Sequence, residues 1–450
     1  MLTWQGRVVD ARLKLLDPSR CRHSKLRRGN AEVHAVTFQP LGSKYNNDHL
    51  VTQSWEILGQ QWLMLAVFDG YRGDATARYV ARSLLGRIQE RLREIIVDTF
   101  GGLLDRLNCD AAEPVVSSML EEEVLACERR LVQSVSSICP ENRNLTEDDA
   151  RGLFQRHGEE ITRAKCGTTI SLALVAVEEH FMWAVNVGNS SVAITTIVPA
   201  EEQGKRSAQQ PCTRHSILSV GDAYTVHLPA DSGKLSKAAD ERPFVWLNTS
   251  RVLGAILHKA PYAYLRDLFH YAYQNQGTRT PEPPAVVEKI PSNLSLKADP
   301  SVRFIDLKPM RDKDPILVLF TDGVNCLVNG STVFTPGVSS SAHPLTVMAS
   351  MLAGPDRDLS IFPTKSPMSL ELALGHGVDF GWSRAHGVDN IAVEILFNLL
   401  GGSNADRLEQ VVNWDRAIAH NPNLFIDDTT IIIARLGRAL PVMSSAESAS

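Results

Sequence analysis

The amino-acid sequence predicts an α+β fold, with helices layered on largely antiparallel β-sheets. Its most apolar segments are short runs of about 5 to 8 residues, which is the length of buried strands rather than of helices. Two of these runs, Ile170–Val177 and Phe181–Val187, are too close in sequence for a parallel crossover between them. Helical patterns occur in blocks between the strand clusters, which disfavours a doubly wound parallel sheet.

Buried strands are expected in the apolar segments Trp62–Phe68, Ile170–Val177, Phe181–Val187, Ile316–Phe320 and Thr430–Leu436. Helices are expected after Asp74, over about 116–138 and over Asn390–Leu400. The first helix has apolar residues at helical spacing from Ala77 onward, which gives it one apolar face. The last is expected to end at Gly401, because glycine commonly follows the end of a helix.

The chain is expected to form one domain over 29–436, preceded by a basic arm over 1–28. The arm is rich in arginine and poor in acidic residues, which is typical either of a solvated arm or of an organelle targeting segment. Stretches rich in Gly, Pro, Ser or charge near 199–245, 275–298 and 331–380 are expected to be surface insertions. The tail over 437–450 is small and polar, and we expect it to be disordered.

The composition is that of a globular protein, with 44% apolar and 22% charged residues among 450 and a formal net charge of -5. So balanced a charge argues against a nucleic-acid partner. No apolar run is long enough for a membrane span or a secretory signal, so we expect an intracellular protein, cytoplasmic or in the mitochondrial matrix. We also expect the protein to be a monomer. The cysteines form no C-x-x-C pair, which argues against a zinc site or a disulfide framework.

Four segments place a polar or acidic residue where an apolar strand runs into a turn. They are Ala66–Gly70 (AVFDG), Val187–Ser190 (VGNS), Leu319–Gly323 (LFTDG) and Phe425–Thr429 (FIDDT). A carboxylate at the end of a rigid strand has little rotational freedom, and a following glycine lets a backbone carbonyl approach a cation. Several such carboxylates, if they converge, would make a site for Mg²⁺ or Mn²⁺, although each Asp-Gly pair alone is typical of an ordinary turn.

The order and spacing of these segments resemble the metal-dependent PPM-type (type 2C) Ser/Thr protein phosphatases over about 30–436. Leu63–Gly73 is similar to the family's strand followed by V-F-D-G-H-x-G, and Cys166–Ser190 to its G-T-T…V-A-N-x-G-D-S pattern. Ile316–Gly323 resembles L-V-L-A-S-D-G, and Asp427–Ile431 resembles D-[ND]-x-T-V. The resemblance implies a four-layer α/β/β/α sandwich. The segment Arg251–Ala255 (RVLGA) is similar to the branch that contains the pyruvate dehydrogenase phosphatases, so that branch is the expected one.

The resemblance also implies a site with two ions of Mg²⁺ or Mn²⁺. Asp69 would bridge the ions, the Gly70 carbonyl would bind one, and Asp322 and Asp427 would bind the other. Water activated by the metal would then hydrolyse phosphoserine or phosphothreonine in a phosphoprotein substrate. Asp48 keeps one of the two acidic residues that the family has before its first site strand.

The expected site departs from the family at several positions. Asn47 replaces a glutamate that helps to hold the metal water shell, and Asn189 replaces the aspartate of G-D-S. Tyr71 stands in place of the histidine that protonates the leaving group, and a phenol with a pKa near 10 is the poorer acid at pH 7. Tyr262 and Ala263 replace a Gly-Asp pair. Two functions therefore stay open: an attenuated phosphatase, or a catalytically inactive pseudophosphatase that binds a phosphoprotein or another partner.

Two basic residues near the expected site in sequence, Lys44 and Arg72, are candidates for binding the substrate phosphate, with a plain surface role equally open. Lys259 stands where the family has an arginine. A cysteine-dependent phosphatase is a competing class because Cys21–Arg27 fits C-x₅-R, but this segment has no glycine that would let backbone N–H groups wrap a phosphate. The P-loop, G-x-S-x-G and H-E-x-x-H motifs do not occur.

Overall fold

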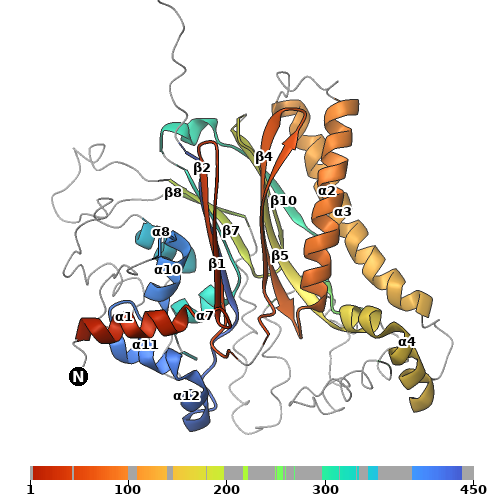
Figure 1. The fold of residues 1–450 in the computed structure, drawn as a ribbon. Coiled ribbons are helices and arrows are strands. Elements are labelled where there is room, and N and C mark those ends of the chain that lie inside the picture. The colour runs from red at the N-terminus through yellow and green to blue at the C-terminus, as the bar shows by residue number, and fades with distance from the viewer. Residues whose placement is uncertain are drawn as a thin grey trace, which may run out of the picture.

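Two antiparallel sheets pack face to face between two layers of helices (Figure 1). The computed structural model describes residues 4–42, 45–99, 109–138, 145–178, 180–196, 216–220, 249, 251–256, 259, 268, 296–313, 315–330, 332–333, 343–352 and 388–437. The predicted α+β class and the four-layer arrangement are confirmed.

The first sheet has the strand order β1-β2-β12-β11-β7-β8, and each neighbouring pair is antiparallel. Its strands are β1 (Cys21–Arg28), β2 (Ala31–Phe38), β7 (Ser191–Thr196), β8 (Ser216–Val220), β11 (Ile316–Phe320) and β12 (Thr429–Arg435). Strands from both ends of the chain thus lie at the centre of one sheet.

The second sheet has the order β10-β6-β5-β4-β3, with β9 paired to β5. Its strands are β3 (His49–Ile57), β4 (Gln60–Tyr71), β5 (Gly167–Ala176), β6 (Phe181–Val187), β9 (Leu253–Gly254) and β10 (Ser301–Asp306). These pairs are antiparallel as well.

Helices cover the outer face of each sheet, as Figure 1 shows. The second sheet is covered by α2 (Ala75–Asp98) and α3 (Cys109–Ile138), with α4 (Glu147–Lys165) beside them. The first is covered by α1 (Trp4–Leu15), α7 (Gly323–Asn329), α8 (Pro344–Leu352), α10 (Ile391–Leu400), α11 (Ala405–Val412) and α12 (Trp414–His420). A 3₁₀ helix, η4 (Lys308–Lys313), leads into β11. No helix in the described ranges is long and apolar enough to cross a membrane.

The strands are apolar on both faces because both faces are buried. On β4, Met64 and Phe68 pack against the helices, while Leu65 and Val67 pack between the sheets. Strands β11 and β12 alternate in the same way across the other sheet. This alternation decides which polar residues at the strand ends enter the space between the sheets.

The strands and helices expected from periodicity are confirmed. The five apolar segments match β4, β5, β6, β11 and β12, with Val177 and Leu436 one residue beyond the strand ends, and the expected helices correspond to α2, α3 and α10. Helix α10 begins at the cap residue Asn390, whose side chain accepts hydrogen bonds from the N–H groups of Ala392 and Val393. The helix ends at Gly401, which has a positive φ of 155°.

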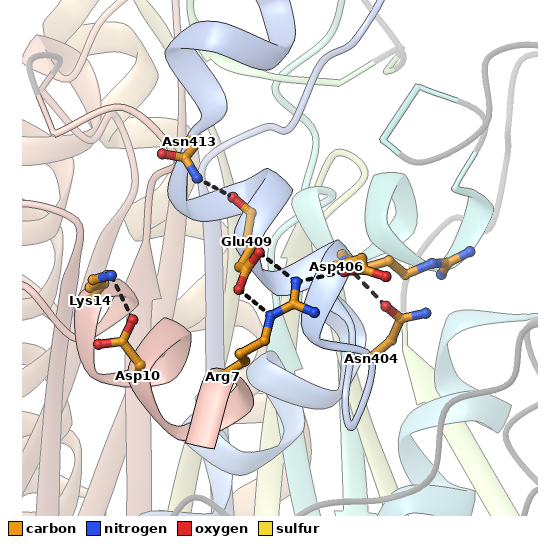
Figure 2. A network of polar contacts seen from close by, with 8 residues as sticks. Arg7, Asp10, Lys14, Asn404, Asp406, Glu409 and Asn413 are labelled. Atoms are coloured by element: carbon orange, nitrogen blue, oxygen red, sulfur yellow. Dashed lines mark hydrogen bonds and ion pairs between the residues drawn. The ribbon is translucent and has the colours of Figure 1, made fainter. Parts of the chain in front are cut away.

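The expected division between a basic arm and the domain at residue 28 is corrected by the structure. Helix α1 lies on α11 and buries Val8 and Leu15, and β1 pairs with β2 along its length. Figure 2 shows Arg7 between Glu409 and Asp406, with its Nη2 atom 2.7 Å from a carboxylate oxygen of each. The basic residues of this segment therefore anchor it to the domain.

The other boundary predictions fall mostly outside the described residues. Within the expected insertions, only β8, 296–298, 332–333 and α8 are described, and of the tail only Gly437. The insertions and the tail therefore stay predictions.

Candidate active site

The strand pattern brings three aspartates to one end of the sandwich. Asp69 follows Leu65 and Val67 on the inner face of β4. Asp322 lies between β11 and α7, and Asp427 lies two residues before β12. Strands β11 and β12 are paired neighbours, so their aspartates emerge at the same end, close enough for both to act electrostatically on Asp69.

These carboxylates form a partly exposed cluster of like charges. Asp69 and Asp322 lie close enough for each to affect the pKa of the other. Burial raises the pKa of Asp69 well above its ordinary value, and the charges of Asp322, Asp48 and Asp427 raise it further. Burial is also the first cause of the raised pKa of Asp427 and of Asp322. Within the described ranges, no basic side chain forms an ion pair with any of these three aspartates.

Asp48 lies in the segment between β2 and β3, near the cluster, and is 1% exposed. Its Oδ2 atom accepts hydrogen bonds from the hydroxyls of Thr321 and Thr430, both at 2.8 Å. Its Oδ1 atom is buried and has no hydrogen-bond partner within the described residues. Burial, followed by the nearby charge of Asp428, raises the pKa of Asp48 well above its ordinary value. The two threonines therefore fix one oxygen of Asp48 and leave the other unpaired.

Two glycines allow the loops of the site to pack closely. A Cβ atom on Gly70 would collide with the carbonyl oxygen of Asn47, and one on Gly323 with the carbonyl oxygen of Asp428. No role is predicted for Asp428 from the sequence, but its Oδ2 accepts a hydrogen bond from the Asn47 N–H at 2.8 Å. Asp428 thus ties the segment before β3 to the segment before β12.

Asn189, which replaces an expected aspartate, contacts the cluster directly. Its Nδ2 donates a hydrogen bond to Asp322 Oδ2 at 2.7 Å. Its Oδ1 is buried and unpartnered within the described part of the chain. The amide therefore stabilises the ionised form of Asp322 without adding a negative charge.

Tyr71 lies two residues beyond Asp69, so both side chains leave the same face of β4. It packs against the apolar cluster of Val252, Ala255 and Leu296. The guanidinium carbon of Arg72 lies 5.1 Å from the centroid of the Tyr71 ring. The phenol is thus held next to the cluster between an apolar patch and a cation.

The other residues named from the sequence do not contact the cluster in the described part of the structure. Lys44, Tyr262 and Ala263 lie outside the described residues. Lys259 donates hydrogen bonds to Glu128 and to the carbonyl oxygen of Val252, each at 2.6 Å. Its amine therefore holds the segment before it against α3 and is not directed at the carboxylates.

A cavity of about 260 Å³ opens beside Asp48, and no sequence pattern predicts it. Its lining includes Arg22, His23, Thr37, Asp48 and His49. Arg22 lies opposite Thr37 in the register of β1 and β2, which places a cation beside the buried carboxylate. The strand β1 is polar and exposed, so no apolar pattern indicated that it borders the site.

The donor chemistry of the cluster suits a hard divalent cation. Its ligand atoms are carboxylate oxygens, and Asp48 Oδ1 and Asn189 Oδ1 are buried without a partner among the described residues. The ligands are not pre-arranged, however, because no three His, Cys, Asp or Glu side chains of the described ranges form a group that could hold a metal ion. In this arrangement Asp322 instead accepts a hydrogen bond from Asn189.

The structure as a whole is similar to solved structures of low sequence identity. One is a serine-threonine phosphatase 2C from Toxoplasma gondii, with a TM-score of 0.46, 11% identity, and coverage of 92% of this chain and 98% of that one. Another is a sex-determining protein of C. elegans, with a TM-score of 0.33, 12% identity, and coverage of 93% and 64%. No protein-family profile and no curated protein sequence matches the chain. With identities this low, the role of each residue has to be argued from the chain itself.

Proposed function

We propose that this chain is a metal-dependent protein serine/threonine phosphatase of the PPM type, attenuated by its substituted positions. The main support is the meeting of Asp69, Asp322 and Asp427 in one cluster of like charges, although they come from segments far apart in the chain. Carboxylates gathered without a basic partner repel one another, which is costly unless a cation or protons neutralise them.

Asp69, Asp322, Asp427 and the Gly70 carbonyl are the groups that would hold Mg²⁺ or Mn²⁺. When bound, such ions lower the pKa of water and neutralise charge on phosphoryl oxygens. A carboxylate binds a cation in its ionised form, so cation binding would compete with protonation of Asp69 and Asp322, whose pKa values are raised. Asp48, fixed by Thr321 and Thr430, offers its unpaired oxygen as an acceptor for water.

Two side chains of this site are candidates for acting on the substrate directly. Arg22, in the cavity beside Asp48, is placed to bind a phosphate with its planar guanidinium group. Tyr71 is the candidate proton donor for the leaving alkoxide. Because a phenol is a weak acid at neutral pH, we expect this step to limit the rate.

A pseudophosphatase is the second candidate, and a specific observation favours it. Asn189 donates a hydrogen bond to an Asp322 oxygen that would otherwise be free to bind a metal. In addition, the described residues contain no group of three side chains arranged to hold a metal ion. A protein of this kind would keep the surface that recognises a phosphoprotein and lack turnover.

The two candidates are separated by a turnover assay on the full chain. With millimolar Mn²⁺, the protein should hydrolyse a phosphothreonine peptide, and the Asp322→Ala variant should lose the activity. Asp415→Ala, which removes an exposed carboxylate from α12, is the matched control and should keep it. Equal trace rates for the protein and for Asp322→Ala would reject the phosphatase and favour the pseudophosphatase.

A further inference from the structure

A cavity of about 860 Å³ lies between α2 and α4, two helices that contact each other on the outer side of the second sheet (Figure 1). The side chains that matter for its chemistry are Arg78, Tyr79 and Arg82 from α2, and Phe154, Glu159 and Arg163 from α4. None of these residues belongs to the carboxylate cluster. We call this cavity the α2–α4 groove.

Positive charge dominates the lining. Arg78 and Arg82 are four positions apart and share one face of α2, and Arg163 comes from the opposite side. Among the described lining residues, Glu159 has the only carboxylate. Arg78 lies 3.6 Å from Asp74, whereas neither Arg82 nor Arg163 forms an ion pair with a described carboxylate. The groove therefore has cationic groups that remain available to an anionic partner.

Aromatic side chains give the groove a partly apolar, ordered wall. The guanidinium carbon of Arg163 lies 4.3 Å from the centroid of the Tyr79 ring, and Phe154 lies half-buried in the same lining. The Thr76 hydroxyl donates a hydrogen bond to the Arg163 carbonyl at 2.6 Å, which joins the two helices at this point. Arg163 is thus held in position before any partner binds, which lowers the entropic cost of binding.

The groove begins close to the carboxylate cluster. Ala75 lines it and follows Asp69 by only six residues, so the two lie at most about 21 Å apart at the length of an extended chain. An extended peptide advances about 3.3 Å per residue, so about six to eight residues would reach from the cluster into the groove. A peptide held at the cluster can therefore have its flanking residues in the groove.

We propose that the α2–α4 groove binds an acidic segment of the substrate protein, located about six to eight residues from its phosphorylated residue. This assignment of the substrate class rests on the proposed function, whereas the binding of an acidic peptide by the groove can be tested without turnover. Carboxylates of the peptide pair with Arg82 and Arg163, and its apolar atoms cover Tyr79 and Phe154.

Binding is tested with a fluorescein-labelled octapeptide of alternating Glu and Asp and the full chain, by fluorescence anisotropy. Arg82→Glu should weaken binding about tenfold or more, because it replaces attraction with repulsion at an exposed position of the groove. The matched control is Arg93→Glu, an exposed arginine of α2 that does not line the groove, and it should change the affinity by less than about twofold. Equal losses in both variants would show general charge attraction, and equal binding of a Gln/Asn octapeptide would show that the carboxylates are not recognised; either result would overturn the proposal.

Turnover tests the link to the substrate. The value of kcat/KM should be higher for a phosphothreonine peptide with the acidic segment than for the same peptide with Gln and Asn there, and Arg82→Glu should remove the difference. The same variant should leave hydrolysis of p-nitrophenyl phosphate unchanged, because this small ester does not reach the groove. No hydrolysis of any substrate, with octapeptide binding still lost in Arg82→Glu, would reject the phosphatase but keep the groove. Hydrolysis that ignores the acidic segment would reject the groove's role and keep the phosphatase.

Discussion

Asp322 is the residue at which the electrostatics of the candidate site converge. It acts electrostatically on Asp69 and accepts a hydrogen bond from Asn189. Its charge also helps to raise the pKa of Asp427 and of Cys326. A change at any neighbour of Asp322 should therefore affect both the stability of the fold and the binding of cations.

Asn189→Asp should make the site a better cation ligand and a less stable one when no metal is bound. The new carboxylate would face Asp322 where the amide now donates a hydrogen bond, so we expect a loss of about 1 to 3 kcal/mol in the free energy of unfolding with EDTA present. Mn²⁺ should bind about tenfold more tightly, as measured by titration calorimetry. Asn423→Asp, in an exposed turn, is the control. Unchanged Mn²⁺ affinity in Asn189→Asp would contradict the assignment of this position.

Tyr71→His tests the proton donor. An imidazole titrates near pH 6.5, so the variant should turn over a phosphothreonine peptide at least about tenfold faster than the wild type at pH 7. Tyr71→Phe keeps the ring against Val252, Ala255 and Leu296 and should not exceed the wild-type rate. The measurement is kcat between pH 6 and pH 9. A histidine variant that is no faster at any pH would remove Tyr71 from the reaction.

Asp69, Asp322 and Asp427 were expected from the sequence because each follows or precedes an apolar strand, and Asp48 only from the family resemblance. The groups around them were not. Thr321 and Thr430 look like ordinary strand-end residues until the fold places both hydroxyls on Asp48. Arg22 was equally hidden, because it borders Asp48 only through the pairing of β1 with β2. A sequence pattern records neighbours along one strand, whereas these contacts join different strands.

At the level of elements, a strand can be predicted from the sequence when both of its faces are buried, because it is then a continuous apolar run. β4, β5, β6, β11 and β12 are continuous apolar runs and were predicted, since both sides of each strand lie in a core. β1 is charged and mostly exposed at the edge of its sheet, so it has no such pattern. α1 was missed for a related reason, since only part of it is buried and its basic residues suggested a free arm.

Leu15→Ala tests whether α1 is part of the domain. Leu15 is fully buried against the first sheet's helical layer, so its truncation should lower the free energy of unfolding by about 2 to 5 kcal/mol. Leu13→Ala, on the same helix but 60% exposed, is the matched control and should cost less than about 0.5 kcal/mol. Urea unfolding monitored by tryptophan fluorescence measures both. Equal small effects would return α1 to the status of a separate arm.

At the scale of the whole molecule, the sandwich joins a tightly packed core to an end that carries excess negative charge. Strands from the N-terminal and C-terminal parts of the chain lie side by side in the first sheet, and Asp69 comes from the second, so the carboxylates meet only when both sheets are formed. The repulsion among them is therefore a property of the folded state, because the unfolded chain keeps them far apart. Any cation that binds this end stabilises the fold as a whole.

The pH dependence of stability should reveal this repulsion. Asp48, Asp69, Asp322 and Asp427 have pKa values above their ordinary value in the folded protein, so between about pH 4 and those raised values the folded state binds more protons than the unfolded one. The free energy of unfolding of the metal-free protein should thus fall as the pH rises through this range, and Asp322→Asn should reduce the slope.

Mn²⁺ at a hundred times its Kd at pH 8 should add about 2.7 kcal/mol to the free energy of unfolding at that pH. The same concentration should add less at pH 5, where protons compete for the carboxylates. Urea unfolding at both pH values, with EDTA or with Mn²⁺, measures the four quantities. A slope that is the same in Asp322→Asn, with no gain from Mn²⁺, would mean that the cluster holds no cation.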